Sequence, residues 1–268
     1  SIVSATSYGT GFSLASFLGR INYGFNNRYL LTLTARADGS SRFSKNNRFG
    51  FFPSASAAWR LSDESFFRHN LFTDLKLRVS YGLTGDQEIG DFQNISFYGP
   101  SRYDGLPGIQ LRNIADPDLR WQNNRMLNVG VDYEVKGGQF SGSVEFFKSN
   151  KNRLLSEDII PGTTGFSTVT RNSGEVQNLG VEMNLNAFAI RRTHFTWNVN
   201  FNATYVKNEI KSLTTDGVLT GAYSDLEATH ILKIGEPVGT MIGVKYLGVD
   251  PQTGEVTCQK LVMAVDCG

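Results

Sequence analysis

The most constraining feature of this sequence is an alternation of apolar and polar residues with a period of two, sustained over long runs. Residues 75–84 show it clearly. Their odd positions place Leu75, Leu77, Val79, Tyr81 and Leu83 on one face, while their even positions carry Lys, Arg, Ser, Gly and Thr. Successive side chains of a β-strand point to opposite faces, so this stretch is predicted to be a strand with one apolar and one polar face.

The same alternation recurs along the chain and predicts eight strands. They lie at about residues 12–25, 28–38, 49–60, 75–84, 119–134, 140–155, 175–189 and 195–208. Several of them exceed the length of about five or six residues that is typical of globular strands. Crossing a bilayer at a tilt takes about 9–11 residues, so the predicted strands are long enough to span one.

The connections between these strands alternate in length. The short links are Asn26-Asn27, residues 136–139 with Gly137-Gly138, and residues 190–194; the long ones are 39–48, 85–118, 156–174 and the segment after residue 208. Only residues 61–74, whose Ser-Asp-Glu opening suits the cap of a short helix, blur the alternation. Antiparallel neighbours place alternate links at opposite rims, so short turns gather at one rim and long loops at the other, as in outer-membrane barrels.

Charge and composition exclude several classes of function. The chain has 26 basic and 25 acidic residues, a balance that gives no electrostatic case for nucleic-acid binding. No apolar run approaches the roughly 18 residues of a membrane helix. Cys258 and Cys267 form a lone late pair, not a disulfide framework. Catalytic motifs, phosphate loops and metal-ligand spacings are not found, so we expect neither an enzyme nor a bound cofactor or metal.

Aromatic residues cluster near the ends of the predicted strands. They are Tyr23, Phe25, Tyr29, Phe49, Phe51, Phe52, Trp59, Trp121, Tyr133, Phe195, Trp197 and Tyr205. Such rings settle at the membrane–water boundary, so the pattern favours parts of two girdles around a transmembrane barrel. A β-sandwich core also takes alternating aromatics, and this alternative stays open. The long polar faces rich in Asn, Ser and Thr count against it.

Ten short segments go beyond pattern, and in their order and spacing they resemble the SusC/RagA family of TonB-linked outer-membrane transporters of Bacteroidetes. The resemblance covers about residues 15–255. The segments are NNRYLLT (26–32), RADGSSRF (36–43), FFPS (51–54), AWRLS (58–62), LRVSYG (77–82), TGDQ (84–87), PDLRW (117–121), NVGVD (128–132), GTTGF (162–166) and NSGEVQNLGVE (172–182).

The resemblance implies an all-β fold, an antiparallel up-and-down transmembrane barrel of about 22 strands. This chain would supply about eight consecutive strands, as an internal fragment that lacks the plug domain and the contact with the TonB complex. The resemblance further implies a place in the outer membrane in contact with lipid, and a SusD-like surface lipoprotein over the barrel mouth. The implied cargo is oligosaccharides, or peptides in the RagA branch. We expect an open curved sheet, since a cut barrel keeps two free edges.

The end of the chain departs from the family pattern. After GVDPQTGE (248–255) the family continues into an acidic stretch rich in Asp, Asn and Gly. This chain instead reads TCQKLVMAVDCG at residues 257–268. We expect a truncated or frame-shifted end, with ordinary loop variation as the alternative. The domain prediction is therefore a partial barrel over residues 1–268 with an atypical tail at 256–268.

Candidate binding residues lie in the long loops, because loops on a rigid scaffold commonly carry function. Loop 85–118 offers Phe97, Tyr98, Arg102 and Tyr103, and loop 156–174 offers Phe166. Aromatic faces can stack on sugar rings; packing within the loops or against the lipoprotein is the alternative for each residue. Segment 38–43 is expected to be a structural loop in which Arg42 pairs with Asp38.

Two other functions remain compatible with the residues alone. One is a soluble β-sandwich that serves as a binding or adhesion module, and the other is a passive porin-like barrel. A sandwich would bury its apolar face beneath a second sheet, whereas a barrel would leave that face uncovered. Coordinates therefore decide between the first alternative and a barrel.

Overall fold

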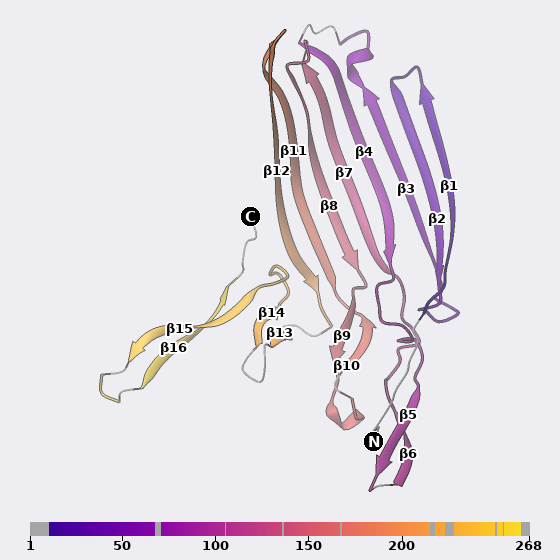
Figure 1. The fold of residues 1–268 in the computed structure, drawn as a ribbon, viewed down its shortest axis with the longest axis vertical. Coiled ribbons are helices and arrows are strands. Elements are labelled where there is room, and N and C mark those ends of the chain that lie inside the picture. The colour runs from indigo at the N-terminus through magenta and orange to yellow at the C-terminus, as the bar shows by residue number, and fades with distance from the viewer. Residues whose placement is uncertain are drawn as a thin grey trace.

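The computed structural model describes residues 11–67, 71–104, 106–135, 137–166, 168–214, 218–222, 228–249, 251–253 and 255–263. Its main feature is an antiparallel sheet of eight long strands in the order β1-β2-β3-β4-β7-β8-β11-β12 (Figure 1). Each long strand pairs with the next long strand along the chain. The main sheet is therefore an up-and-down meander, as the period-two pattern predicts.

The eight long strands agree with the predicted segments to within a few residues. They are β1 (Leu14–Phe25), β2 (Tyr29–Ser40), β3 (Phe49–Arg60), β4 (Phe72–Asp86), β7 (Gln122–Val135), β8 (Phe140–Asn152), β11 (Glu175–Arg192) and β12 (Phe195–Ser212). The prediction of eight long antiparallel strands is confirmed.

Short links gather at one end of the main sheet, which we call the turn rim (the upper end in Figure 1). Asn26 and Asn27 join β1 to β2 with φ of 51° and 55°, the left-handed conformation that a two-residue hairpin turn requires. Gly137 and Gly138 do the same between β7 and β8, with φ of 87° and 65°. Residues 61–63 form a single 3-10 turn, η1 (Leu61–Asp63), without a side-chain cap, so the predicted helix cap is absent.

Long links gather at the opposite end, the loop rim, and they contain structure that the sequence pattern did not predict. Two hairpins project there, one of β5 (Tyr98–Tyr103) and β6 (Leu106–Leu111), the other of β9 (Leu155–Ile159) and β10 (Thr168–Asn172) around the turn η2 (Gly162–Thr164). A separate four-stranded sheet follows β12. It consists of β13 (Val218–Ala222), β14 (Ala228–Leu232), β15 (Met241–Val249) and β16 (Val256–Met263).

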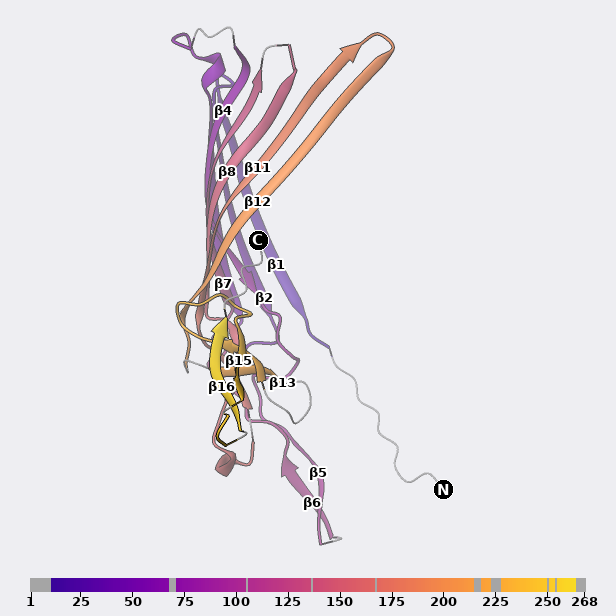
Figure 2. The same cartoon turned by 90° about the vertical axis from the view of Figure 1, so that its left-hand side faces the viewer.

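The main sheet is open. β1 and β12 are its two ends, and no pairing joins them among the described residues. Figure 2 shows the hairpin of β11 and β12 inclined away from β4 at the turn rim, so that the sheet is curved and twisted. The expected open curved sheet is confirmed.

The chain's end lies partly outside the described residues. β16 covers the backbone of residues 256–263, including Cys258, whereas residues 264–268 and Cys267 lie outside the described part. The interpretation of the tail as a truncated or frame-shifted end therefore stays a prediction. Among the described residues, no helix has the length and apolarity needed to cross a membrane.

Candidate functional site

One pairing row crosses all eight strands of the main sheet with apolar residues only. From β1 to β12 it comprises Tyr23, Leu31, Ala57, Val79, Val129, Phe146, Val181 and Tyr205. Directly opposed residues point to the same face, so they form one continuous apolar stripe. Val79 is 45% exposed and Tyr205 67% exposed, and no second sheet of the described chain lies over them.

The other face of the sheet is polar over its first five strands. One residue along, the pairing row carries Asn22, Thr32, Ser56, Ser80 and Asn128. On β8 the same row carries Phe147, whose ring covers Gly180 of β11. A Cβ atom at Gly180 would lie 2.5 Å from Cζ of Phe147, so the glycine leaves the room that this ring occupies.

The apolar face does not end at the same row on every strand. On β1 it extends from Phe17 to Phe25, so its centre is at Ile21. The pairing row that starts at Ile21 crosses the sheet and reaches β12 at Lys207. On β12 it extends from Phe195 to Tyr205, centred about seven residues nearer the turn rim. The rise is about 3.4 Å per residue and the spacing about 4.8 Å per strand. If the apolar band lies parallel to the membrane plane, an offset of about seven residues over seven strand spacings tilts the strands by about 35° from the membrane normal. That inclination agrees with the tilt of about 35–45° in transmembrane barrels.

A cluster of aromatic rings closes the apolar face at the turn rim. Tyr29 stacks on Trp59 with ring centroids 6.1 Å apart, and Phe25 and Phe66 each lie 6.4 Å from one of these rings. Oε1 of Glu64 accepts hydrogen bonds from the hydroxyl of Tyr29 (2.6 Å) and from Nε1 of Trp59 (3.0 Å). These hydrogen bonds, the one from Tyr29 foremost, hold the pKa of the Glu64 carboxyl below its usual value. This cluster matches part of the predicted girdle.

Charged side chains form a network on the polar face. Asp132 of β7 accepts from Nζ of Lys76 (2.8 Å) and from Nε of Arg78 (3.0 Å), and Arg78 also pairs with Glu145 of β8 (2.6 Å). Arg78 reaches Glu145 across Gly130, where a Cβ atom would lie 3.0 Å from Nε of Arg78. The glycine thus lets one guanidinium bridge three strands.

A buried hydrophobic cluster lies at the loop rim. It consists of Phe43, Phe52, Ile89, Leu119 and Trp121. Phe52 and Trp121 were predicted to belong to an aromatic girdle, which is wrong, because each is only 6% exposed. The pairing of β3 with β4 ends at Ser54 and Gly82, and the cluster fastens the loops beyond this point.

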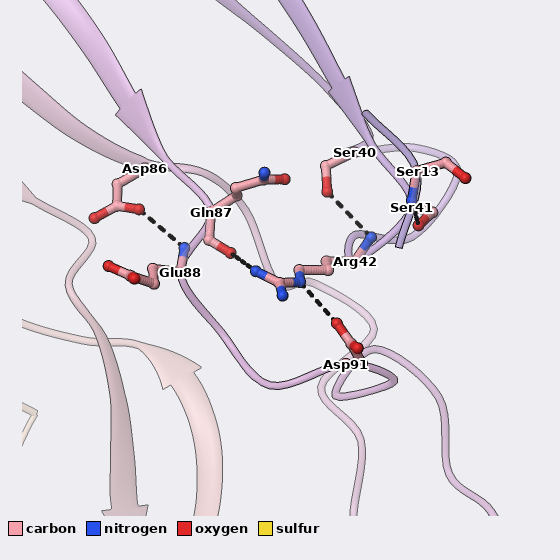
Figure 3. Close-up of polar contacts among 8 residues, drawn as sticks. All are labelled: Ser13, Ser40, Ser41, Arg42, Asp86, Gln87, Glu88 and Asp91. Atoms are coloured by element: carbon pink, nitrogen blue, oxygen red, sulfur yellow. Dashed lines mark hydrogen bonds and ion pairs between the residues drawn. The ribbon is translucent and has the colours of Figure 1, made fainter. Parts of the chain in front are cut away.

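Arg42 ties two long links together at the loop rim (Figure 3). Its Nε donates to Oδ1 of Asp91 at 2.9 Å and its Nη1 donates to the carbonyl oxygen of Gln87 at 3.3 Å. The predicted pair of Arg42 with Asp38 is wrong, because Asp38 pairs with Arg36 on its own strand at 2.7 Å. The prediction of a structural loop over residues 38–43 is right only for residues 41–43, because residues 38–40 are the end of β2.

A hollow of about 380 Å³ lies on the polar face of the sheet, next to the links of the loop rim. Its wall combines rings and charges, which include Arg20, Arg36, Asp38, Phe52 and Asp86. Sequence reasoning did not single out Arg20, Arg36 or Asp86 for a site. The signal was available in principle, since all three occupy polar-face positions, with Arg20 near the middle of β1 and Arg36 and Asp86 toward the loop end of β2 and β4.

The candidate binding residues fall on two separate hairpins. Phe97, Tyr98 and Arg102 lie at or on β5, are exposed, and are followed by Tyr103 at the end of that strand. Phe166 follows η2 between β9 and β10. The bases of the two links do meet, since Asn172 donates to the carbonyl oxygen of Arg120 at 2.8 Å. No hydrogen bond or ring contact joins Phe166 to Phe97, Tyr98 or Arg102 in the described part of the chain. Their role in binding stays a prediction.

Comparison with known proteins decides the family. A family model described as "TonB dependent receptor-like, beta-barrel" matches residues 2–247. The chain belongs to this family of TonB-dependent receptors.

Individual members of the family show the same relationship. The chain is 37% identical to TonB-dependent receptor P39 of Formosa agariphila over 90% of its own length and 23% of that protein. It is 38% identical to TonB-dependent receptor SusC of Bacteroides thetaiotaomicron over 78% of its length and 22% of that protein. The structure of the RagAB peptide transporter superposes with a TM-score of 0.83 at 27% identity, covering 91% of this chain and 27% of that one. The chain thus spans about a quarter of the relatives that it matches.

Membership in the TonB-dependent receptor family settles two of the expectations. Members are outer-membrane receptors and not enzymes, so the chain is an outer-membrane protein without a catalytic assignment. The soluble sandwich interpretation is wrong, because the described apolar face carries no second sheet and the fold is that of the receptor barrel.

Proposed function

We propose that this chain forms about eight consecutive strands in the wall of a TonB-dependent importer of the outer membrane. The observation that carries the proposal is the exposed apolar row from Tyr23 to Tyr205, backed by a polar face. An exposed apolar face that is continuous over eight strands is stable in contact with lipid hydrocarbon, whereas in water it would drive aggregation. The apolar face therefore contacts lipid, and the polar face lines the lumen.

The asymmetry of the links gives the orientation. Outer-membrane barrels have short turns on the periplasmic side and long loops outside, so the turn rim lies in the periplasm and the loop rim faces the exterior. The unpaired edges of β1 and β12 support a larger barrel, since an open edge exposes unpaired backbone groups that cost several kcal/mol each in lipid. Neighbouring strands of the receptor would pair with both edges.

Cargo is proposed to be an oligosaccharide or a peptide, taken up together with a SusD-like lipoprotein and driven by the TonB complex through a plug domain. SusC and the RagAB peptide transporter support this class. The hairpins that carry Tyr98, Arg102 and Phe166 project from the loop rim, where cargo or a lipoprotein lid would approach. The hollow beside Arg20 and Asp86 lies on the inward path from that rim.

Uptake in living cells tests the proposal. The gene that encodes the receptor would be deleted, and entry of labelled oligosaccharides and labelled peptides would be compared with that of the parent strain, with and without dissipation of the proton-motive force. We expect one cargo class to lose uptake on deletion and also on dissipation of that force. Uptake that depends on the gene but not on that force would indicate a passive pore and contradict energised import.

A further inference from the structure

Basic residues mark the boundary of the apolar face on three strands toward the loop rim. Along each strand, the first outward-facing residue beyond the last apolar one is basic: Arg125 follows Leu127 on β7, Lys148 follows Phe146 on β8, and Lys207 follows Tyr205 on β12. On β11 the corresponding residue is Gln177, which follows Leu179. The three basic side chains are all exposed.

The register brings these three residues into one patch. Lys148 pairs with Leu179, which in turn pairs with Lys207, so two strand spacings of about 4.8 Å separate their backbones. Arg125 lies diagonally across from Lys148, because Lys148 pairs with Leu127 two residues along β7. Diagonal neighbours of this kind lie about 7–8 Å apart, within reach of long basic side chains.

No salt bridge among the described residues neutralises this patch, although the charge of Lys207 also acts on Glu209. Arg125, Lys148 and Lys207 form no ion pair with another residue in the described part of the chain. Two carboxylates lie on the same face, nearer the loop rim. Glu209 pairs with Lys211, and Glu175 accepts a hydrogen bond from Nδ2 of Asn150 at 3.1 Å. A net positive patch remains at the edge of the apolar face.

We propose that Arg125, Lys148 and Lys207 form a binding site for the phosphate groups of a lipid headgroup in the outer leaflet. The position follows from the inclined apolar band: with strands inclined by about 35°, the three residues at its edge lie within about 6 Å of one another along the membrane normal. At this level a lipid whose chains cover Phe146 and Tyr205 presents its headgroup to the basic side chains. Arg and Lys are the donors that phosphate oxygens prefer. The site adds a lipid ligand to the receptor and does not depend on the identity of its cargo.

Purified intact receptor provides the test, with lipid binding measured by native mass spectrometry. The probes are lipid A carrying two phosphates, the same lipid A after enzymatic removal of its phosphates, and inorganic phosphate alone. The test variant combines Arg125→Gln, Lys148→Gln and Lys207→Gln. The control combines Lys45→Gln, Lys151→Gln and Arg192→Gln, which removes the same charge at exposed positions elsewhere. Heat-modified migration on gels verifies that each variant is folded.

We expect the test variant to bind phosphorylated lipid A about tenfold more weakly or worse, since each basic residue near an anionic surface adds to the affinity. The control variant should bind like the parent. The proposal is overturned if the test variant keeps its affinity, if the control loses as much, or if dephosphorylated lipid A binds equally well. Binding of inorganic phosphate with equal affinity would also overturn the assignment to a lipid. Should the triple variant fail to fold, Lys148→Gln and Lys148→Arg replace it, and only the Arg variant should retain binding.

Discussion

The hydroxyl of Tyr29 donates a 2.6 Å hydrogen bond to Oε1 of Glu64, and thereby links the first residue of β2 to the turn that follows β3. The same oxygen accepts from Nε1 of Trp59, and Arg28 lies 3.4 Å from the other oxygen. One carboxylate thus fixes the orientation of two rings at the turn rim. Amphipathic rings gain from this boundary only when their polar atoms have partners.

Glu64→Gln is expected to lower the melting temperature of the intact receptor in detergent at neutral pH and to change it little in acid. Because the folded-state pKa of Glu64 is lowered, its charged form stabilises the fold above the ordinary carboxyl pKa, and this stability is lost as the pH falls through the lowered value. Melting curves between pH 3 and pH 7 measure the difference. Asp63→Asn, at the exposed neighbouring carboxylate, is the control; an equal pH dependence in both variants would contradict the assignment to Glu64.

Val79→Arg and Val131→Arg are expected to impair assembly of the receptor, while Ser80→Arg is milder. Both valines lie near the middle of the apolar band, where an arginine facing lipid costs about 2–4 kcal/mol. Ser80 faces the polar side beside Asn128, where the guanidinium stays hydrated. The fraction of each variant that resists heat and protease in isolated outer membranes is the measurement, and equal yields for all three would refute the assignment of the two faces.

The parts of this fold that were predictable from the sequence are those that depend on residues close to one another in the chain. The alternation of Leu77, Val79 and Tyr81 with polar residues is a property of one strand, and Asn26-Asn27 determines its own turn, so strands and short turns were predicted within a few residues. The hairpins β5–β6 and β9–β10 lie in long links without sustained alternation. Nothing in their local pattern distinguishes a short strand from an irregular loop.

Contacts between distant segments were the least predictable part. Arg42 had Asp38 nearby in sequence, yet it pairs with Asp91, 49 residues away, because Arg36 already occupies Asp38. Phe52 and Trp121 are aromatic residues near strand ends, as girdle residues are, but their side chains fill the space where the pairing of β3 and β4 ends. The patch of Arg125, Lys148 and Lys207 can be recognised only once the register of β7, β8, β11 and β12 is known.

Gly180→Ala is expected to destabilise the barrel by about 1–3 kcal/mol, the usual cost of adding a group to a filled space. The new Cβ would lie 2.5 Å from the ring of Phe147 and 2.6 Å from the backbone oxygen of Tyr205. The ring can rotate, but the backbone oxygen is held in the ladder between β11 and β12.

Gly19→Ala on β1 is the matched control, because nothing lies within 4 Å of the position of its Cβ. Alanine there should be neutral or slightly stabilising, since glycine in a strand costs about 0.5–1 kcal/mol relative to alanine. Urea unfolding of the refolded receptor in lipid vesicles gives both values. A smaller loss for Gly180→Ala than for Gly19→Ala would show that Phe147 does not occupy this space.

Breaking the contact of Arg42 with Asp91 is expected to loosen the link between β4 and β7 without affecting the wall. Both side chains are largely buried, at 17% and 13% exposure, and their atoms lie 2.9 Å apart, so the loss of either partner leaves the other charge poorly solvated. Arg42→Ala and Asp91→Ala should each speed limited proteolysis within residues 87–121, and the double variant should add little to either single one. Lys45→Ala, on the same link but exposed, is the control, and additive effects of Arg42→Ala and Asp91→Ala would contradict a direct coupling between the two loops.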